Sequence, residues 1–154
     1  MKIHRFLYTL AAILMLSSCS ITDSADFATD EVEFLDIEFR ATVENSKLIE
    51  FRNQNAWEAF WNEHIDLHNP AISEFFPEVD FQRNWVAGVF WGQSSGCTSQ
   101  ANHGITGVGL MNAKAFINTT GMPYTGACRM IVHPRAFLVF PKTVKSAEVR
   151  WGED

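Results

Sequence analysis

The feature that most constrains the fold is a continuous apolar run, WVAGVFW, at residues 85–91. No polar side chain interrupts it, so a strand formed by this run has no face that prefers water. A run of this length is typical of a strand rather than a helix, because buried strands usually have about four to eight residues. The sequence therefore predicts a central strand that other parts of the chain cover on both faces.

Other segments supply candidate partners for this strand. Apolar and polar residues alternate over residues 35–44, which predicts a first strand there. Asn112, Ala113 and Lys114 have the composition of a turn between two apolar segments and predict a hairpin. Further strands are expected at residues 48–52, 105–111, 115–119, 136–140 and 147–151.

One helix is expected between the second strand and the central strand. Asn55 followed by Glu58 has the spacing of a capping box with Asn as the cap. Trp57, Phe60 and Trp61 follow at helical spacing, and this aromatic stripe is typical of core packing. We expect the helix at about residues 55–68. The predicted fold is mostly β (α+β), a small antiparallel sheet, sandwich-like or half-barrel, with one amphipathic helix near its start.

The N-terminus has the organisation of a bacterial export signal. Lys2 and Arg5 precede an apolar run at residues 6–16, which is shorter than the roughly 20 residues that a membrane-spanning helix needs. The following LSSC resembles a lipobox, in which Cys19 becomes the lipidated first residue of the mature chain. By that resemblance, Ser20 in the second mature position implies the outer membrane. Lipidation of Cys19 would make the membrane the first partner of this protein.

The remaining chain divides into a tether and one domain. Residues 1–18 are expected to be the signal peptide, residues 19–33 a lipidated, acidic, flexible tether, and residues 34–154 a single β-rich domain. Residues 20–80 carry fifteen acidic and three basic side chains, whereas residues 81–154 carry three acidic and seven basic ones. This distribution lacks the strongly basic surface that nucleic-acid binding requires.

The segment GQSSG at residues 92–96 matches the GxSxG pattern of a serine hydrolase, with Ser94 as the nucleophile. A nucleophile elbow requires a helix directly after the serine, but CTSQANHG follows at residues 97–104 without helical periodicity. His103 and His133 also precede every downstream carboxylate, which is not the order of the α/β-hydrolase triad. A catalytic role for Ser94 is therefore the weakest functional hypothesis, and we expect a protein without enzymatic activity or cofactor.

Cys97 and Cys128 remain after lipidation of Cys19, and this pair can form a disulfide, bind a metal or stay as two unpaired thiols. An even number of cysteines in an oxidising envelope compartment favours a disulfide. Alternatively, Cys97 with His103 and Cys128 with His133 supply four ligands for a metal such as zinc, or for a small molecule. The spacings within both Cys/His pairs are looser than usual for zinc, so the disulfide is the preferred interpretation.

The order of motifs along residues 51–142 resembles the PrcB C-terminal-like domain, a family named for an accessory component of a bacterial surface protease complex. The similar motifs are WEAFW at residues 57–61, Pro77, VDF at 79–81, WVAGVFWG at 85–92 and FPK at 140–142. The family's TGGY-like loop corresponds to residues 94–97, where Cys97 replaces an aromatic residue. The resemblance implies a non-enzymatic, lipid-anchored protein-binding or protease-regulatory module, whose partner is an envelope protease or another protein. A loop with little side-chain bulk is suited to such binding, and its candidate partner-binding residues are Trp91, Gln93, Ser94, Ser95, Gly96 and Thr98.

Overall fold

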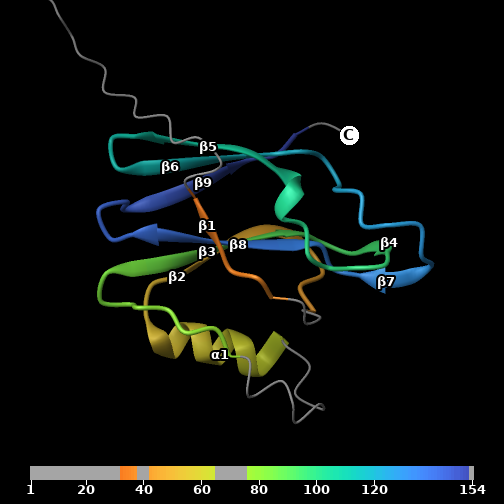
Figure 1. The fold of residues 1–154 in the computed structure, drawn as a ribbon, viewed down its shortest axis with the longest axis horizontal. Coiled ribbons are helices and arrows are strands. Elements are labelled where there is room, and N and C mark those ends of the chain that lie inside the picture. Colours follow the sequence, from red (N-terminus) through yellow and green to blue (C-terminus); the bar gives the residue numbers. More distant parts are fainter. Residues whose placement is uncertain (1–31, 38–41, 65–75, 153–154) are drawn as a thin grey trace, which may run out of the picture.

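The computed structural model of the chain describes residues 32–37, 42–64 and 76–152. Three small sheets and one helix, α1 (Gln54–His64), make up this part of the molecule (Figure 1). The prediction of a mostly β, α+β fold with one helix near its start is confirmed. The predicted signal peptide at residues 1–18, Cys19, and the predicted tether up to residue 31 lie outside the described residues.

The central layer is an antiparallel four-stranded sheet in the order β1-β8-β3-β2. Strand β3 pairs on one side with β8 and on the other with β2, so the apolar run is a central strand as predicted. Backbone hydrogen-bonding groups of β3 are thereby satisfied inside the molecule. The strand bounds are β1 Glu33–Phe34, β2 Ser46–Phe51, β3 Asn84–Trp91 and β8 Arg135–Pro141.

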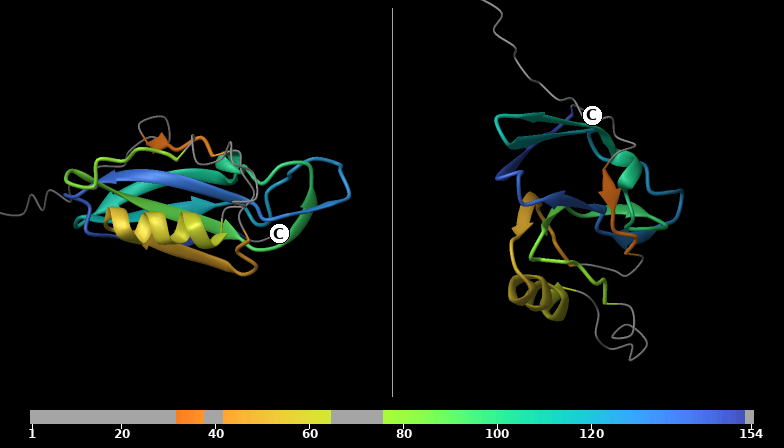
Figure 2. Two further views of the ribbon diagram at one scale, coloured as in Figure 1. Left: turned by 90° about the horizontal axis from the view of Figure 1, so that it is seen from below. Right: turned by 60° about the vertical axis from the view of Figure 1, so that its left-hand side comes forward.

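A second sheet, in the order β5-β6-β9, lies across one face of the first (Figures 1 and 2). Its strands are β5 (Ile105–Met111), β6 (Lys114–Thr119) and β9 (Ser146–Arg150). The predicted hairpin is confirmed, because β5 and β6 are antiparallel and joined by Asn112 and Ala113, which have φ angles of 52° and 61°. Positive φ at both positions is the geometry of a type I′ turn. Strand β9 runs parallel to β6.

The third sheet is a two-stranded ribbon of β4 (Ser94–Gly96) and β7 (Met130–Val132). It extends from one end of the layered part, at the right of Figure 1. A short 3-10 helix, η3 (Asn102–Gly104), leads from the ribbon into β5. The sequence predicted neither β4 nor β7, because three-residue strands are too short to show a period.

Strand β3 separates two hydrophobic cores. Trp85, Ala87 and Val89 point toward the β5-β6-β9 sheet, where they pack with residues such as Val108 and Ile117. Val86 and Phe90 point the other way, into an aromatic core shared with α1. Alternate side chains of a strand point to opposite faces, so one apolar strand serves both cores.

Helix α1 covers the second face of the central sheet with the aromatic stripe predicted from the sequence. Trp57, Phe60 and Trp61 are its buried residues, and the Trp57 ring meets Phe51 edge-on with 4.9 Å between centroids. The predicted cap at Asn55 is wrong. Asn53 Oδ1 accepts a hydrogen bond from the Ala56 N–H at 2.9 Å, so the cap lies two residues earlier than expected. The predicted end near residue 68 lies outside the described residues.

The strand predicted at residues 35–44 is also wrong over the part that the structure describes. Strand β1 ends at Phe34, and residues 35–37 and 42–44 are not strand. The alternation did identify buried side chains, since Ile37 and Val43 are 3% and 2% exposed in the aromatic core. The backbone of the neighbouring Thr42 bonds outside any sheet, because its N–H donates to the His64 carbonyl at the end of α1. The alternation over residues 35–44 therefore predicted which side chains are buried, but it did not predict pairing in a sheet.

Arg135, the first residue of β8, is a buried cation. Its side chain is 1% exposed, and its Nη2 donates to the Ile37 carbonyl at 3.0 Å. Nε and Nη1 have no hydrogen-bond acceptor among the described residues. Burial lowers the pKa of Arg135 to about 10, which corresponds to a penalty of roughly 3 kcal/mol on its charged form. That penalty is at least as large as the roughly 1.5–3 kcal/mol that one hydrogen bond from a charged group returns.

Replacing this cation with an apolar side chain of similar length should stabilise the protein. We expect Arg135→Met to raise the free energy of unfolding by about 1–3 kcal/mol, because the burial penalty disappears and the side-chain volume is kept. Urea denaturation followed by tryptophan fluorescence measures the change. Arg83→Met is the control, since the Arg83 side chain is 86% exposed and carries no such penalty. A destabilisation by Arg135→Met would mean that Arg135 has a partner beyond Ile37.

Candidate functional site

The GQSSG segment forms one strand of the ribbon. Strands β4 and β7 are antiparallel, with Ser94 opposite Val132 and Gly96 opposite Met130. We call β4, β7 and the disulfide that joins their ends the pinned ribbon, and residues 121–129 the covering loop. In Figure 2 the ribbon again lies at one end of the molecule, away from the turn between β5 and β6. The ribbon therefore consists of two short strands, whereas the sequence predicted a loop at this position.

The predicted disulfide between Cys97 and Cys128 is present, with 4.9 Å between the Cα atoms. The Cys128 N–H also donates to Cys97 Sγ at 3.2 Å. The bond closes a loop across 31 positions of sequence, for which chain entropy gives a stabilisation of about 3–4 kcal/mol. An isolated pair of three-residue strands is not stable in water, so the disulfide is what holds the far end of the ribbon in register.

Gly96 allows the covering loop to pack directly on β4. A Cβ atom at this position would lie 1.9 Å from Thr125 Oγ1 and 2.7 Å from Thr125 Cβ, too close for any side chain. The Thr125 carbonyl accepts hydrogen bonds from the N–H groups of Cys97 and Thr98, at 2.7 and 3.3 Å. Thr125 itself is buried. Gly96 is therefore a packing position inside the ribbon.

The structure separates the predicted partner-binding residues into two groups. Trp91 and Gly96 are buried, and Trp91 packs edge-on against Trp151 with 6.1 Å between centroids. These two positions support the ribbon from within. Ser94 is half-buried, and the exposed members of the set are Gln93, Ser95 and Thr98. Only this second group can reach a partner directly.

Sequence reasoning missed the more prominent surface of the ribbon. Six large hydrophobic side chains are exposed in the described part of the chain, and four of them belong to β7 or the covering loop. Tyr124 and Ile131 are the most open, at 75% and 62% exposure. We call these four residues the apolar rim: Met122, Tyr124, Met130 and Ile131. One feature of the sequence could have indicated this surface. The triplet MIV at residues 130–132 is apolar, although the segment around it has no strand pattern.

The base of the ribbon is anchored to the central sheet at Arg135. The Arg135 N–H donates to the Ser99 carbonyl, and the Arg135 carbonyl accepts from the Ala101 N–H, both at 2.8 Å. The Trp91 N–H donates to the Pro134 carbonyl at 3.0 Å. The covering loop is anchored as well, because His103 Nε2 donates to the Tyr124 carbonyl at 2.9 Å. The ribbon is thus fixed at its base by hydrogen bonds and at its tip by the disulfide.

Ser94 does not have the surroundings of a catalytic nucleophile. It lies in a strand, and the next helical element is the three-residue η3 rather than the long helix of a nucleophile elbow. Within the described residues, its hydroxyl has no hydrogen bond to a histidine that could act as a base. The geometry gives no support to the hydrolase hypothesis.

The metal hypothesis loses its sulfur ligands to the disulfide. Cys97 and Cys128 are joined to each other, and a zinc site requires free thiolates. His133 and His103 are not brought together with acidic ligands: no group of three or more His, Cys, Asp or Glu residues in the described ranges could hold a metal ion. The hypothesis that Cys97, His103, Cys128 and His133 form one site is therefore wrong for this structure.

Comparison with family models, with curated proteins and with solved structures found no match for this chain. In the residues that the structure describes, no helix has the length and apolar character needed to cross a bilayer.

The packing of Thr125 against Gly96 leads to a test of the ribbon's architecture. Gly96→Ala should lower the free energy of unfolding by about 1–3 kcal/mol, because the added methyl group forces the covering loop away from β4. Gly107→Ala is the matched control in another strand, since a Cβ there would meet only Asn118 Nδ2, at 3.7 Å. Urea denaturation compares the two variants, and hydrogen exchange locates the change. Equal stability of both variants would contradict the packing described for Thr125.

Proposed function

We propose that this protein is a lipid-anchored component of the cell envelope that binds another protein through the pinned ribbon and its apolar rim. The observation that carries the proposal is the combination of four exposed large hydrophobic side chains with a ribbon fixed at both ends. Single exposed apolar residues are ordinary, but their concentration on one projecting element is typical of interaction surfaces.

The rigidity of the ribbon supports binding. Ordering a flexible loop on association costs free energy, and a loop that is already fixed avoids most of this cost. Tyrosine, methionine and arginine are the residue types enriched at protein interfaces, and the rim contains Tyr124, Met122 and Met130. Arg129 is exposed beside them. Binding would therefore combine apolar contacts with a single positive charge.

The segment of chain that forms the ribbon and the covering loop has few charged side chains. Between Trp91 and Arg135 the sequence contains no Asp or Glu, and the only charged side chains are Lys114 and Arg129. Lys114 lies next to the β5–β6 turn, whereas Arg129 belongs to the covering loop. A partner with an apolar surface and a carboxylate opposite Arg129 would suit this surface best.

The resemblance to the PrcB C-terminal-like domain suggests which class of partner to test first. It implies an envelope protease or an accessory protein of one, with this chain acting as a non-enzymatic regulator. The signal peptide at residues 1–18 and lipidation of Cys19 place the domain in the cell envelope within this proposal, with the outer membrane implied by Ser20.

Lipidation and the disulfide can be tested together by intact-mass analysis. The mature chain should begin at Cys19 and carry the mass of its acyl chains, and reduction should add the mass of two hydrogen atoms from one disulfide. Cys19→Ser is the control, because it removes the acylation site and leaves Cys97 and Cys128 in place. A mature chain with unmodified Cys19 would contradict the lipid anchor.

Site-specific photocrosslinking tests the partner surface. A benzophenone amino acid at position 124 should form a covalent adduct with one envelope protein. The same group at Met111 should not, because Met111 is 50% exposed but lies beside the β5–β6 turn. Mass spectrometry identifies the crosslinked protein, and Ile131→Asp in the same chain should reduce the adduct at least tenfold while the fold is kept. Equal crosslinking from positions 111 and 124 would contradict a specific role for the ribbon.

A further inference from the structure

The disulfide that pins the ribbon is open to solvent. Cys97 and Cys128 are both exposed, although Gly96 and Thr125, which pack together beside Cys97, are buried. Thiol–disulfide exchange requires that an external thiolate reach a sulfur atom, and exposed disulfides are typically the labile or regulatory ones. The bond therefore holds the ribbon and is at the same time accessible to a thiol from outside.

The two sulfur atoms have different surroundings. Cys97 Sγ accepts a hydrogen bond from the Cys128 N–H at 3.2 Å. The backbone of Gly126 packs against the same sulfur, since a Cβ atom on Gly126 would lie 2.6 Å from Cys97 Sγ. The Cys97 N–H is held as well, because it donates to the Thr125 carbonyl at 2.7 Å. Cys97 is thus covered on one side by the covering loop, and its sulfur has a hydrogen-bond donor.

These surroundings give the exchange reaction a direction. One sulfur is attacked, and the other leaves as a thiolate, which leaves faster when its negative charge is stabilised. The Cys128 N–H is placed to stabilise that charge on Cys97, because hydrogen bonds to charged acceptors are the stronger ones. Arg129 follows Cys128 directly in a segment without Asp or Glu, so an anionic attacker is drawn to this cysteine. We propose that the disulfide is a site of reversible thiol modification, in which an external thiol attacks Cys128 and Cys97 is the leaving group.

The reaction balances with a thiol as the only co-reactant. The attacking thiolate forms an S–S bond to Cys128 while the bond between Cys97 and Cys128 breaks. The electron pair of the broken bond remains on Cys97, which then takes a proton from water. A monothiol stops at this mixed disulfide. The second thiolate of a dithiol attacks its own first sulfur and releases Cys128, so the dithiol is oxidised to a disulfide and both cysteines are reduced.

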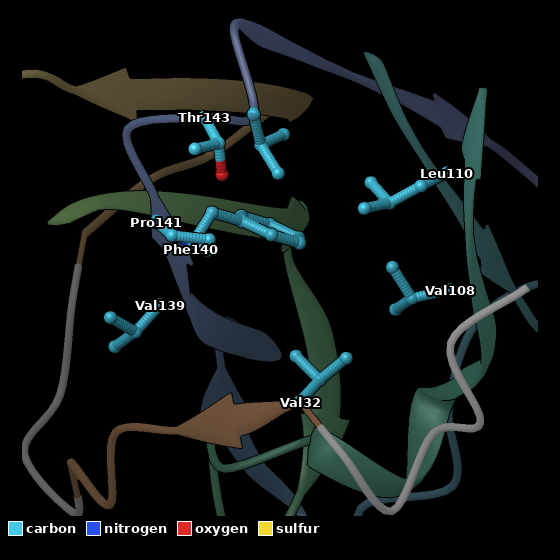
Figure 3. Close-up of a pocket in the computed structure, with 8 residues that line it drawn as sticks. Val32, Val108, Leu110, Val139, Phe140, Pro141 and Thr143 are labelled. Atoms are coloured by element: carbon cyan, nitrogen blue, oxygen red, sulfur yellow. The ribbon is translucent and has the colours of Figure 1, made fainter. Parts of the chain in front are cut away.

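Exchange at this bond should release the ribbon without unfolding the domain. The ribbon pairs only three residues of β4 with three of β7, too few to hold its tip without a covalent link. Its base remains bonded to Arg135, and the two cores lie elsewhere. The core between the larger sheets reaches the opposite end of the molecule, where Val108, Leu110 and Phe140 line a small apolar pocket (Figure 3). A loss of partner binding on release rests on the function proposed above, whereas the exchange reaction does not.

Trapping with glutathione, a monothiol, tests the direction of attack. The chain is used with Cys19→Ser, so that Cys97 and Cys128 are its only cysteines. After a short incubation, iodoacetamide caps the free thiols, and trypsin separates the two cysteines by cleavage after Lys114. We expect glutathione on Cys128 and the iodoacetamide label on Cys97, in about tenfold excess over the reverse arrangement.

The same chain unfolded in urea is the control, because it keeps the sequence around both cysteines and loses the contacts of Cys97. Its glutathione adducts should be divided more evenly between Cys97 and Cys128. An even division in the folded chain, or an excess on Cys97, would overturn the proposed direction. A folded chain that forms no adduct in the time in which the unfolded chain reacts would overturn the exchange site.

Hydrogen exchange tests whether the release is local. Reduction by dithiothreitol, a dithiol, should make amide exchange in β7 and the covering loop about tenfold faster and leave β3 unchanged. The chain with both Cys97→Ser and Cys128→Ser should match the reduced chain. Faster exchange in β3 as well, or no change in β7, would overturn the local release. Crosslinking from position 124 gives a separate measurement: equal adducts in both redox states would contradict regulation of binding, and no adduct in either state would contradict the proposed function alone.

Discussion

Strand β3 has apolar side chains on both faces, so other layers of the structure must cover each face from water. Trp85 and Val89 need a cover on one side, which the β5-β6-β9 sheet provides, and Phe90 needs one on the other, which α1 provides. Gly88 makes the second cover possible: a Cβ there would lie 3.1 Å from the rings of both Phe51 and Phe137. The aromatic residues of the helix, β2 and β8 therefore meet over a flat stretch of β3 backbone.

The sequence predicted most of the features that depend on burial. The central strand, the β5–β6 hairpin and the aromatic face of α1 all follow from apolar periodicity or from turn chemistry within a few residues. Residues 35–44 show the limit of that reasoning. Their alternation identified Ile37 and Val43 as buried, but which backbone groups they pair with depends on β8 and α1, which are distant in sequence.

The candidate site was predicted less well, for a related reason. The disulfide followed from cysteine number and compartment, and the loop around Ser94 and Ser95 was singled out as a candidate partner-binding segment. Its conformation depends on Met130 and Ile131, more than thirty positions later, which pair with it as β7. No local pattern connects two three-residue strands. Whether a side chain such as Tyr124 is exposed likewise depends on which distant segments pack near it in the fold. A local sequence pattern does not show this.

Stability and recognition are located in different parts of this molecule. The two cores around β3 bury nearly all of the large apolar residues of the central sheet, and Arg135 introduces a buried charge where the ribbon joins it, with one hydrogen-bond acceptor, the Ile37 carbonyl, among the described residues. The ribbon contributes little to either core, so its side chains are free of the packing constraints that fix residues in β3. It holds its shape instead through the disulfide, the Thr125 contacts and the hydrogen bonds at Ser99 and Ala101. Since those interactions use mainly backbone atoms and cysteines, the exposed side chains of β7 and the covering loop can vary without unfolding the domain. A surface of that kind can be adapted to a partner at small cost in stability.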